Sequence, residues 1–349
     1  MNKKLITLAI AAAMVAPLAA AAETTLYGRL DTALVYGDDD TKGASGSGNT
    51  DSAWDIDTGT TRIGVKGSED LGNGLSAIFQ AEWEFTSSEH ANSSGSLGSG
   101  LETRLAYGGL SGGFGTVAIG RQWTPYYGAV NKTDIFNNPG GSRVTASEIG
   151  NIANANGNSL GPSRVGNALA YVTPNFNGFV GKLALVIDRG IGQLESDGVD
   201  AYNPSLQYDN GPISIGASAL EWDGDVAGVN DVWGVAGSYN FGMFKLIAQY
   251  EDRDETQVLS GPGPDDGADE WSVAAEANFG NNTIRALYSN VDYDKGNARN
   301  EMDVWAVGFQ HNFSARTRVY AEYAANNVDN RSGSDVDMDQ FSLGLRHDF

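Results

Sequence analysis

Apolar and polar residues alternate along most of the chain after residue 22, in segments of about 9 to 12 residues. In one such segment Trp271, Val273 and Phe279 share one face, and Ser272 and Glu276 share the other. This period of two is typical of β-strands whose faces meet different surroundings. The alternation by itself fits two architectures. One is a soluble sandwich with its apolar face against a second sheet, and the other is a membrane barrel with its apolar face against lipid.

The connections between the alternating segments favour the barrel. We count sixteen segments, centred on residues 24–36, 60–67, 75–85, 103–110, 115–121, 165–173, 179–188, 201–208, 213–221, 231–240, 243–251, 270–279, 282–291, 302–312, 316–324 and 338–349. Every second connection is a tight turn, at residues 70–74, 112–114, 175–178, 209–211, 241–242, 280–281 and 314–315. The intervening connections are longer, often acidic, and rich in Gly, Ser and Asn. We therefore predict an all-β fold, a 16-stranded antiparallel transmembrane β-barrel whose first and last strands pair.

A weak internal repeat supports this architecture. A polar residue followed by Phe closes four alternate strands, at Asn240-Phe241, Asn278-Phe279, Asn312-Phe313 and Asp348-Phe349. Successive Phe residues are 38, 34 and 36 positions apart, and each interval is one hairpin. Aromatic residues at the same end of alternate strands are typical of the girdle at a membrane interface.

The first 22 residues differ from the rest of the chain. Residues 1–4 include two Lys, residues 5–18 form an apolar run, and residues 20–22 are all Ala. This is the order of a secretory signal peptide, so we expect residues 1–22 to be cleaved and residues 23–349 to form the barrel domain. An N-terminal membrane anchor is the alternative, but the apolar run is shorter than the ~20 residues that a spanning helix needs.

Charge and composition exclude several classes of function. The chain has 22 Lys and Arg against 44 Asp and Glu, a net charge of -22, which would repel a phosphate backbone. We therefore expect no nucleic-acid partner. The chain has no Cys, which excludes disulfides, thiol nucleophiles and zinc–thiolate sites.

Motifs for catalysis and metal binding are weak. The three His residues lie in separate segments without the spacing of a metal-binding helix. Residues 109–113 match G-x-S-x-G, but a second strand follows where that motif requires a helix. The run Asp335, Asp337, Asp339 lacks the central Gly of a calcium loop. We expect no enzyme, no catalytic residue, no metal site and no cofactor. Acidic loops that share divalent cations with lipopolysaccharide are a weaker hypothesis.

The longest connection, residues 122–163, contains 42 residues without sustained alternation. Connections of that length are usually functional. A barrel of sixteen strands is wide enough to enclose an aqueous channel. One long loop folded inside it would narrow that channel, so we expect a constriction loop at about residues 122–163.

Several motifs together resemble one known family. They are Leu26-Tyr27-Gly28-Arg29, the run from Thr61 to Gly74, Gly113-Phe114-Gly115 with Gly120-Arg121-Gln122, Arg164-Val165-Gly166-Asn167 with Tyr171, Pro174 and Gly178, and the terminal Phe349. With these motifs the chain resembles, over essentially its whole mature length, the general trimeric porins of Gram-negative outer membranes. The resemblance implies a homotrimer in contact with outer-membrane lipid and lipopolysaccharide, and a third loop folded into the lumen. It also implies passage of small hydrophilic solutes and ions.

By motif position, the resemblance places a basic cluster on the barrel wall at Arg29, Arg62, Arg121 and Arg164. In such porins this cluster faces acids on the third loop, and the field between them orients polar solutes. The alternation of faces along each strand also places Arg29 and Arg62 on the polar side, which agrees with this assignment. Arg121 shares parity with apolar neighbours, so it reaches the lumen only if a bulge intervenes. An exposed charge at the rim is the alternative for each residue, whereas charge on the lipid face is costly.

The loop side departs from the family pattern. Residues 133–141 resemble the segment that carries an acid in the family, but Asn138 stands at the expected position of that acid. Asp134 keeps one carboxylate. The constriction is thus expected to hold four basic residues and one acid, Asp134. This predicts a pore less favourable to cations than the net charge of the chain implies, and it leaves the sign of the selectivity open. Further charges are expected in the lumen at Lys66, Glu82 and Glu84.

The second long loop, residues 86–102, contains Glu89 and many Ser and Gly residues. The resemblance implies that this loop latches over a neighbouring subunit. A mobile surface loop of the same composition is the alternative.

The leading hypothesis for function is passive diffusion of small hydrophilic solutes through a water-filled outer-membrane pore. A substrate-selective channel of the same fold is the alternative, in which Tyr126, Tyr127 and Phe136 stack on sugar rings. An outer-membrane hydrolase or adhesin would need a triad near the rim or a passenger domain. The predicted strands leave no room for either, because they occupy the chain from Glu23 to Phe349.

Overall fold

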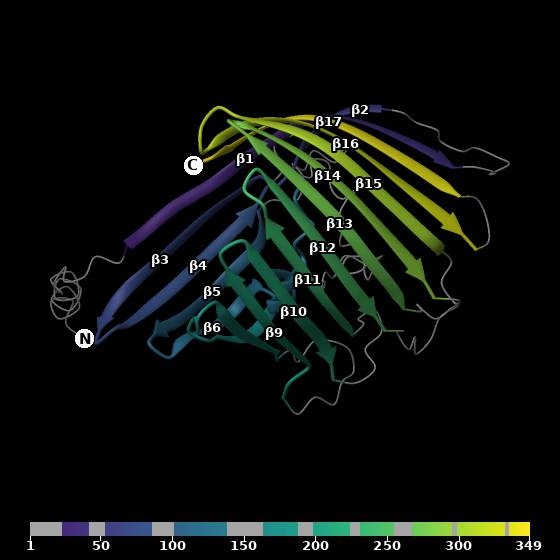
Figure 1. The fold of residues 1–349 in the computed structure, drawn as a ribbon. Helices are drawn as coiled ribbons and strands as arrows, with labels where there is room; N and C mark the ends of the chain where they lie inside the picture. Colours follow the sequence, from purple (N-terminus) through teal and green to yellow (C-terminus); the bar gives the residue numbers. More distant parts are fainter. Residues whose placement is uncertain are drawn as a thin grey trace, which may run out of the picture.

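The strands form one closed antiparallel wall (Figure 1). The structure is a computed structural model that describes residues 23–41, 53–85, 101–137, 163–187, 198–223, 231–254, 267–294, 299–331 and 335–349. Within these residues the wall consists of seventeen strand segments: β1 (Glu23–Thr41), β2 (Ala53–Thr58), β3 (Arg62–Gly72), β4 (Leu75–Glu84), β5 (Glu102–Gly112), β6 (Gly115–Trp123), β7 (Arg164–Val172), β8 (Phe179–Val186), β9 (Ala201–Asn210), β10 (Ile213–Trp222), β11 (Val232–Asn240), β12 (Phe244–Arg253), β13 (Ala268–Phe279), β14 (Asn282–Tyr293), β15 (Arg299–Asn312), β16 (Thr317–Asn330) and β17 (Val336–Asp348). The predicted signal peptide, residues 1–22, lies outside the described residues.

Two of these segments share one position in the wall. Residues 23–29 of β1 pair with β3, and residues 32–37 of β1 pair with β2. β2 and β3 are therefore two halves of one strand, and the described part of the chain forms a barrel with sixteen strand positions. This confirms the predicted 16-stranded antiparallel β-barrel.

The interruption between β2 and β3 fits around Asp31 of β1. A Cβ atom on Gly59 would lie 3.2 Å from the carboxyl carbon of Asp31. The Thr61 hydroxyl accepts a hydrogen bond from the Asp31 N–H and donates one to the Asp31 carbonyl oxygen, both at 2.9 Å. The predicted strand at residues 60–67 covers only the second half. Residues 53–58 were wrongly expected to be loop. Their alternation is too short to predict a strand, and they form one because they pair with the long strand β1.

The last strand closes the barrel against the first. The backbone N–H groups of Gly28 and Phe349 each donate to the other residue's carbonyl oxygen at 3.0 Å. β1 and β17 pair along residues 29–41 (Figure 1, purple beside yellow). Closure pairs the two edges that an open sheet would expose. The four repeated Phe residues are all exposed at the short-turn end of alternate strands, namely Phe241, Phe279, Phe313 and Phe349.

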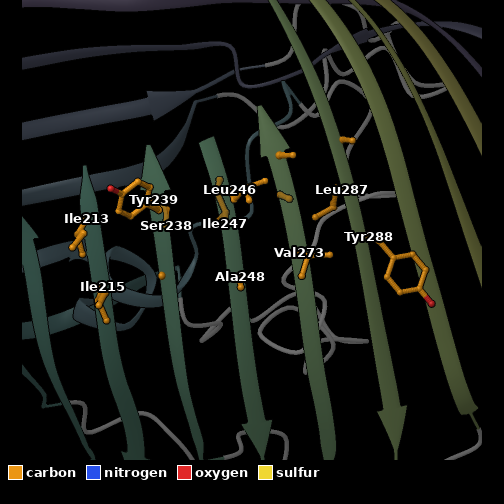
Figure 2. A pocket seen from close by; sticks show the side chains of 14 residues that line it. Ile213, Ile215, Ser238, Tyr239, Leu246, Ile247, Ala248, Val273, Leu287 and Tyr288 are labelled. Carbon is orange, nitrogen blue, oxygen red and sulfur yellow. The ribbon is translucent and has the colours of Figure 1, made fainter. Parts of the chain in front are cut away.

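The outer surface of the barrel is apolar and the inner surface is polar. Trp271 and Val273 of β13 are 44% and 46% exposed, whereas Ser272 between them is 1% exposed. A shallow apolar depression of about 840 Å³ crosses β10 to β14, and its lining includes Ile215, Leu246 and Val273 (Figure 2). This arrangement is the reverse of a soluble core and is typical of a barrel surrounded by lipid.

Substituting Val273 by Lys is expected to destabilise the barrel by about 2–4 kcal/mol, because the new charge would face the membrane midplane rather than water. Thermal unfolding in phospholipid vesicles measures the effect. Val273→Leu is the matched control and should unfold at a temperature close to that of the unsubstituted protein. Equal stability of the Lys and Leu variants would contradict a lipid-facing position for this residue.

Candidate functional site

A short helix begins directly after β6, in the connection that the sequence marks as the longest. α2 (Pro125–Val130) starts at Thr124, whose hydroxyl oxygen accepts the N–H of Tyr127 at 3.0 Å. Pro125 occupies the first helical turn, where a missing N–H has no cost. No helix was predicted here, although Thr followed by Pro is a recognisable helix start. No helix in the described part of the chain is long and apolar enough to cross a membrane.

α2 packs against the inner face of β8 to β11. The Tyr126 N–H donates to the Asn203 side-chain oxygen at 3.0 Å. Two glycines of the wall allow this close approach. A Cβ atom on Gly216 would overlap the Ala129 carbonyl oxygen, and one on Gly234 would lie 2.7 Å from the Tyr126 hydroxyl. The helix position is therefore fixed by small residues of the wall as much as by hydrogen bonds.

The residues after α2 continue along the inner face towards β16. The Thr133 hydroxyl and the Lys132 N–H donate to the Gln249 side-chain oxygen of β12 at 3.0 and 3.1 Å. Further along, the Asn137 N–H and side-chain amide donate to the Glu322 carboxylate at 3.1 and 2.8 Å. The Arg346 guanidinium donates to the Asn137 side-chain oxygen at 3.4 Å. Residues 124–137 are thus bound to the wall at three separate places.

One group of charges lies on β3, β4 and β5. Arg104 donates to Glu82 at 2.7 Å and also pairs with Glu84, while Arg62 lies 3.5 Å from Glu82. Arg104 and Glu82 are both buried. The sequence motifs did not single out Arg104, and strand parity would place it on the outer face with Ala106. The pairing of β4 with β5 shifts register next to Arg104, and this bulge brings it inside.

A second group of charges lies on β1, β16 and β17. Arg29 and Arg318 both pair with Asp348 at 2.7 Å, and Arg346 lies 3.5 Å from the same carboxylate. The sequence motifs identified Arg29 only. Three guanidinium groups therefore share one carboxylate at this part of the wall.

Arg121 and Arg164 flank the third long connection. The pairing of β6 with β7 shifts register just after Gly120, which has φ +127°, and this irregularity changes the facing of Arg121. The Arg121 Nε donates to the Thr103 carbonyl oxygen at 3.0 Å, and the Arg164 guanidinium lies 4.9 Å from the Trp123 ring centroid. Among the residues that the structure describes, neither guanidinium has a carboxylate oxygen within 4 Å.

The remaining predicted site residues are placed as follows. Asp134 accepts a hydrogen bond from the Tyr127 hydroxyl at 3.4 Å. Burial, with a smaller contribution from Asp134, raises the pKa of Tyr127 to about 12, so the phenol stays neutral. The Lys66 ammonium is exposed and lies 5.2 Å from the Tyr27 ring centroid. Asn138 and Glu89 lie outside the described residues.

Neither a metal site nor a nucleophile elbow is assembled in the described part of the chain. No three His, Asp or Glu side chains there are grouped so that they could hold a metal ion. Residues 109–113, which match G-x-S-x-G, are the end of β5 and the first residue of the turn to β6, and no helix follows them. An apolar outer wall, a polar inner wall and sixteen antiparallel strand positions define an outer-membrane β-barrel channel.

Comparison with known proteins identifies the family. A family model described as "Gram-negative porin" matches residues 8–331. The chain therefore belongs to the Gram-negative porin family, whose members are channels of the bacterial outer membrane.

Individual relatives agree with this assignment. The chain is 32% identical to outer membrane porin protein 32 of Delftia acidovorans, over 93% of this chain and 89% of that protein. It is 26% identical to major outer membrane protein P.IB of Neisseria meningitidis serogroup B, over the full length of both. Among solved structures, the anion-selective porin from Comamonas acidovorans has 26% identity and a TM-score of 0.77, over 94% of this chain and 100% of that one. OmpF of Salmonella typhi shares the fold, with 18% identity and a TM-score of 0.73 over 93% and 97%.

Proposed function

We propose that this protein is a passive diffusion pore for small hydrophilic solutes and that it favours anions. In this proposal residues 1–22 are removed as a signal peptide. The third loop, residues 122–163, folds into the lumen and narrows it opposite a wall rich in arginine. The pore performs no catalysis and needs no cofactor.

The observation that carries this proposal is the imbalance of charge beside the loop. Arg121 and Arg164 stand where the loop leaves and rejoins the wall, and neither has a carboxylate oxygen within 4 Å among the described residues. The carboxylates of Glu82 and Glu84 are held by Arg104 and Arg62. A permeating anion would therefore meet guanidinium groups that lack a close counter-charge, which lowers its energy in the lumen.

One structural relative supports the same sign of selectivity. The solved structure with 26% identity and a TM-score of 0.77 is described as an anion-selective porin. The net charge of -22 does not argue against this, because many acidic residues lie in the long connections rather than on the strands. Screening limits the reach of those distant charges to about 10 Å at 0.1 M salt.

A homotrimer surrounded by lipid and lipopolysaccharide is part of the proposal. The exposed apolar wall requires lipid or another subunit on every side. One solved structure of the same fold, OmpT of Vibrio cholerae, is described as a trimer form. Glu89 in the second long loop is the residue we assign to the contact between subunits.

A sugar-selective channel is the second candidate, and the aromatic residues of the loop argue against it. Tyr126 is 1% exposed, so its ring has no free face. Tyr127 stacks on Trp123 with ring centroids 4.6 Å apart. Phe136 is in contact with the wall, since a Cβ atom on Gly308 would lie 3.1 Å from its ring. Each ring is therefore packed against the protein, although Tyr127 and Phe136 stay half-exposed.

Recordings from planar bilayers test the proposed function. The purified protein is expected to insert with conductance in three equal steps, because each subunit of a trimer carries one pore. Liposomes containing the protein should swell at rates that fall smoothly with the size of the sugar. Absence of conductance would refute the pore, and saturable uptake of one sugar would favour the substrate-selective channel.

A further inference from the structure

A polar cavity of about 410 Å³ lies between the third loop and the short-turn end of the barrel. Its lining comes from the turn between β9 and β10, the adjacent ends of β11 and β12, and the loop residue Lys132. Charged groups in the lining are Lys132, Lys245 and Asp209. Ile213 and Ser238, which Figure 2 labels at this end of the wall, also border the cavity. The position is distinct from the arginine groups on β1, β3, β5 and β17.

The lysines at this cavity are not neutralised by close acids. The Lys132 ammonium donates to the Ser214 hydroxyl at 3.0 Å. Lys182 of β8 interacts electrostatically with Lys132 and with Asp209. In the described part of the chain, no ammonium group of Lys132, Lys182 or Lys245 has a carboxylate oxygen within 4 Å. The acids near the three cations therefore act at longer range. They are Asp209, and Glu276, which lies opposite Lys245 where β12 pairs with β13.

Burial destabilises the charged form of Lys132. It lowers the pKa of the Lys132 ammonium, Asp209 opposes this effect, and the neighbouring Lys245 adds to it by a smaller amount. A bound anion would oppose the same destabilisation of the charged form. The cavity is polar enough to hold a hydrated solute and large enough for a small one.

We propose that this cavity is a binding site for a small free oxyanion, such as inorganic phosphate, on the periplasmic side of the constriction. Lys132 and Lys245 supply the charge, Lys182 adds to the field, and the hydroxyls of Ser214 and Ser238 supply hydrogen bonds. Asn240 also lines the cavity, and its side-chain oxygen already accepts the N–H of Gly242 at 2.8 Å, so in this proposal its amide nitrogen supplies a donor. The site rests on the proposed anion pathway. A permeating anion would reach it after passing Arg121 and Arg164.

Block of chloride current by phosphate tests this site. Single pores are recorded in KCl while inorganic phosphate is added to the periplasmic side. We expect the chloride conductance to fall along a saturable curve. Removing one of the two main charges, in Lys245→Gln or Lys132→Gln, should raise the half-saturating phosphate concentration at least threefold.

Arg316→Gln is the matched control, because Arg316 is an exposed cation at a short turn elsewhere on the rim. It should leave the phosphate curve unchanged. A linear, unsaturable effect of phosphate, or equal curves for the two Lys variants and the unsubstituted protein, would overturn the site while the anion preference of the pore stood. Saturable, Lys-dependent block in a pore without anion preference would instead support the site and refute the proposed selectivity.

Discussion

Replacing Arg121 and Arg164 together by Gln is expected to lower the chloride-to-potassium permeability ratio about fivefold. Each guanidinium contributes about 0.5 kcal/mol to the energy of an anion a few ångströms away in a screened aqueous lumen, and about 1.4 kcal/mol corresponds to a factor of ten. The two contributions act on the same ion as it passes the loop. The ratio is obtained from the zero-current potential in a KCl gradient.

The double variant with Lys at both positions is the control for this experiment. It keeps both charges while removing the planar guanidinium groups, so the permeability ratio should stay close to that of the unsubstituted pore. If the Gln and Lys variants gave the same ratio, charge at these positions would not set the selectivity. If the chloride-to-potassium permeability ratio fell in the Gln variant but not in the Lys variant, the cause would be the lost charge and not a change in pore size.

Substituting Gly344 by Val is expected to destabilise the barrel by about 3 kcal/mol or more, or to prevent folding. Gly344 of β17 pairs directly with Tyr320 of β16, and a Cβ atom on Gly344 would overlap the Tyr320 ring. That ring is 1% exposed, and its hydroxyl donates to the Asp31 carboxylate at 2.8 Å. A larger residue at 344 would displace the ring and leave the buried Asp31 with one hydrogen bond fewer.

A double substitution separates this specific clash from a general intolerance of the strand. Gly344→Val combined with Tyr320→Ala should be no less stable than Tyr320→Ala alone, because the space occupied by the ring is then free. The Tm in detergent micelles measures all three variants. Additive losses of Tm from the two substitutions would contradict the contact between Gly344 and Tyr320.

The architecture was predictable because the two faces of each strand meet different solvents. Trp271 and Val273 alternate with Ser272 in the sequence, and the same residues alternate between exposed and buried in the structure. Short turns and long connections also alternate, so the number of strands followed from counting hairpins. Two features did not follow from the sequence: the length of β1 and the division of its partner into β2 and β3. Both depend on pairing between distant residues.

The charged groups were predictable only in part, for a different physical reason. Parity assigns a residue to a face only while the strand stays regular. Arg104 and Arg121 both lie beside a shift in register, where parity no longer assigns a face. A sequence motif carries Arg121, whereas no motif carries Arg104. The contacts of Asn137 with Glu322 and of Lys132 with Ser214 join residues far apart in the sequence and have no local signal.

The most direct test of the account is the zero-current potential of the unsubstituted protein in a KCl gradient at neutral pH. Because Arg121 and Arg164 lack a close counter-charge beside the loop, the pore should pass chloride more readily than potassium, which fixes the sign of the potential. We expect that sign, and we expect its magnitude to decrease as the salt concentration is raised, because screening weakens the wall charges. A potential of the opposite sign, showing preference for potassium, would contradict the proposed function.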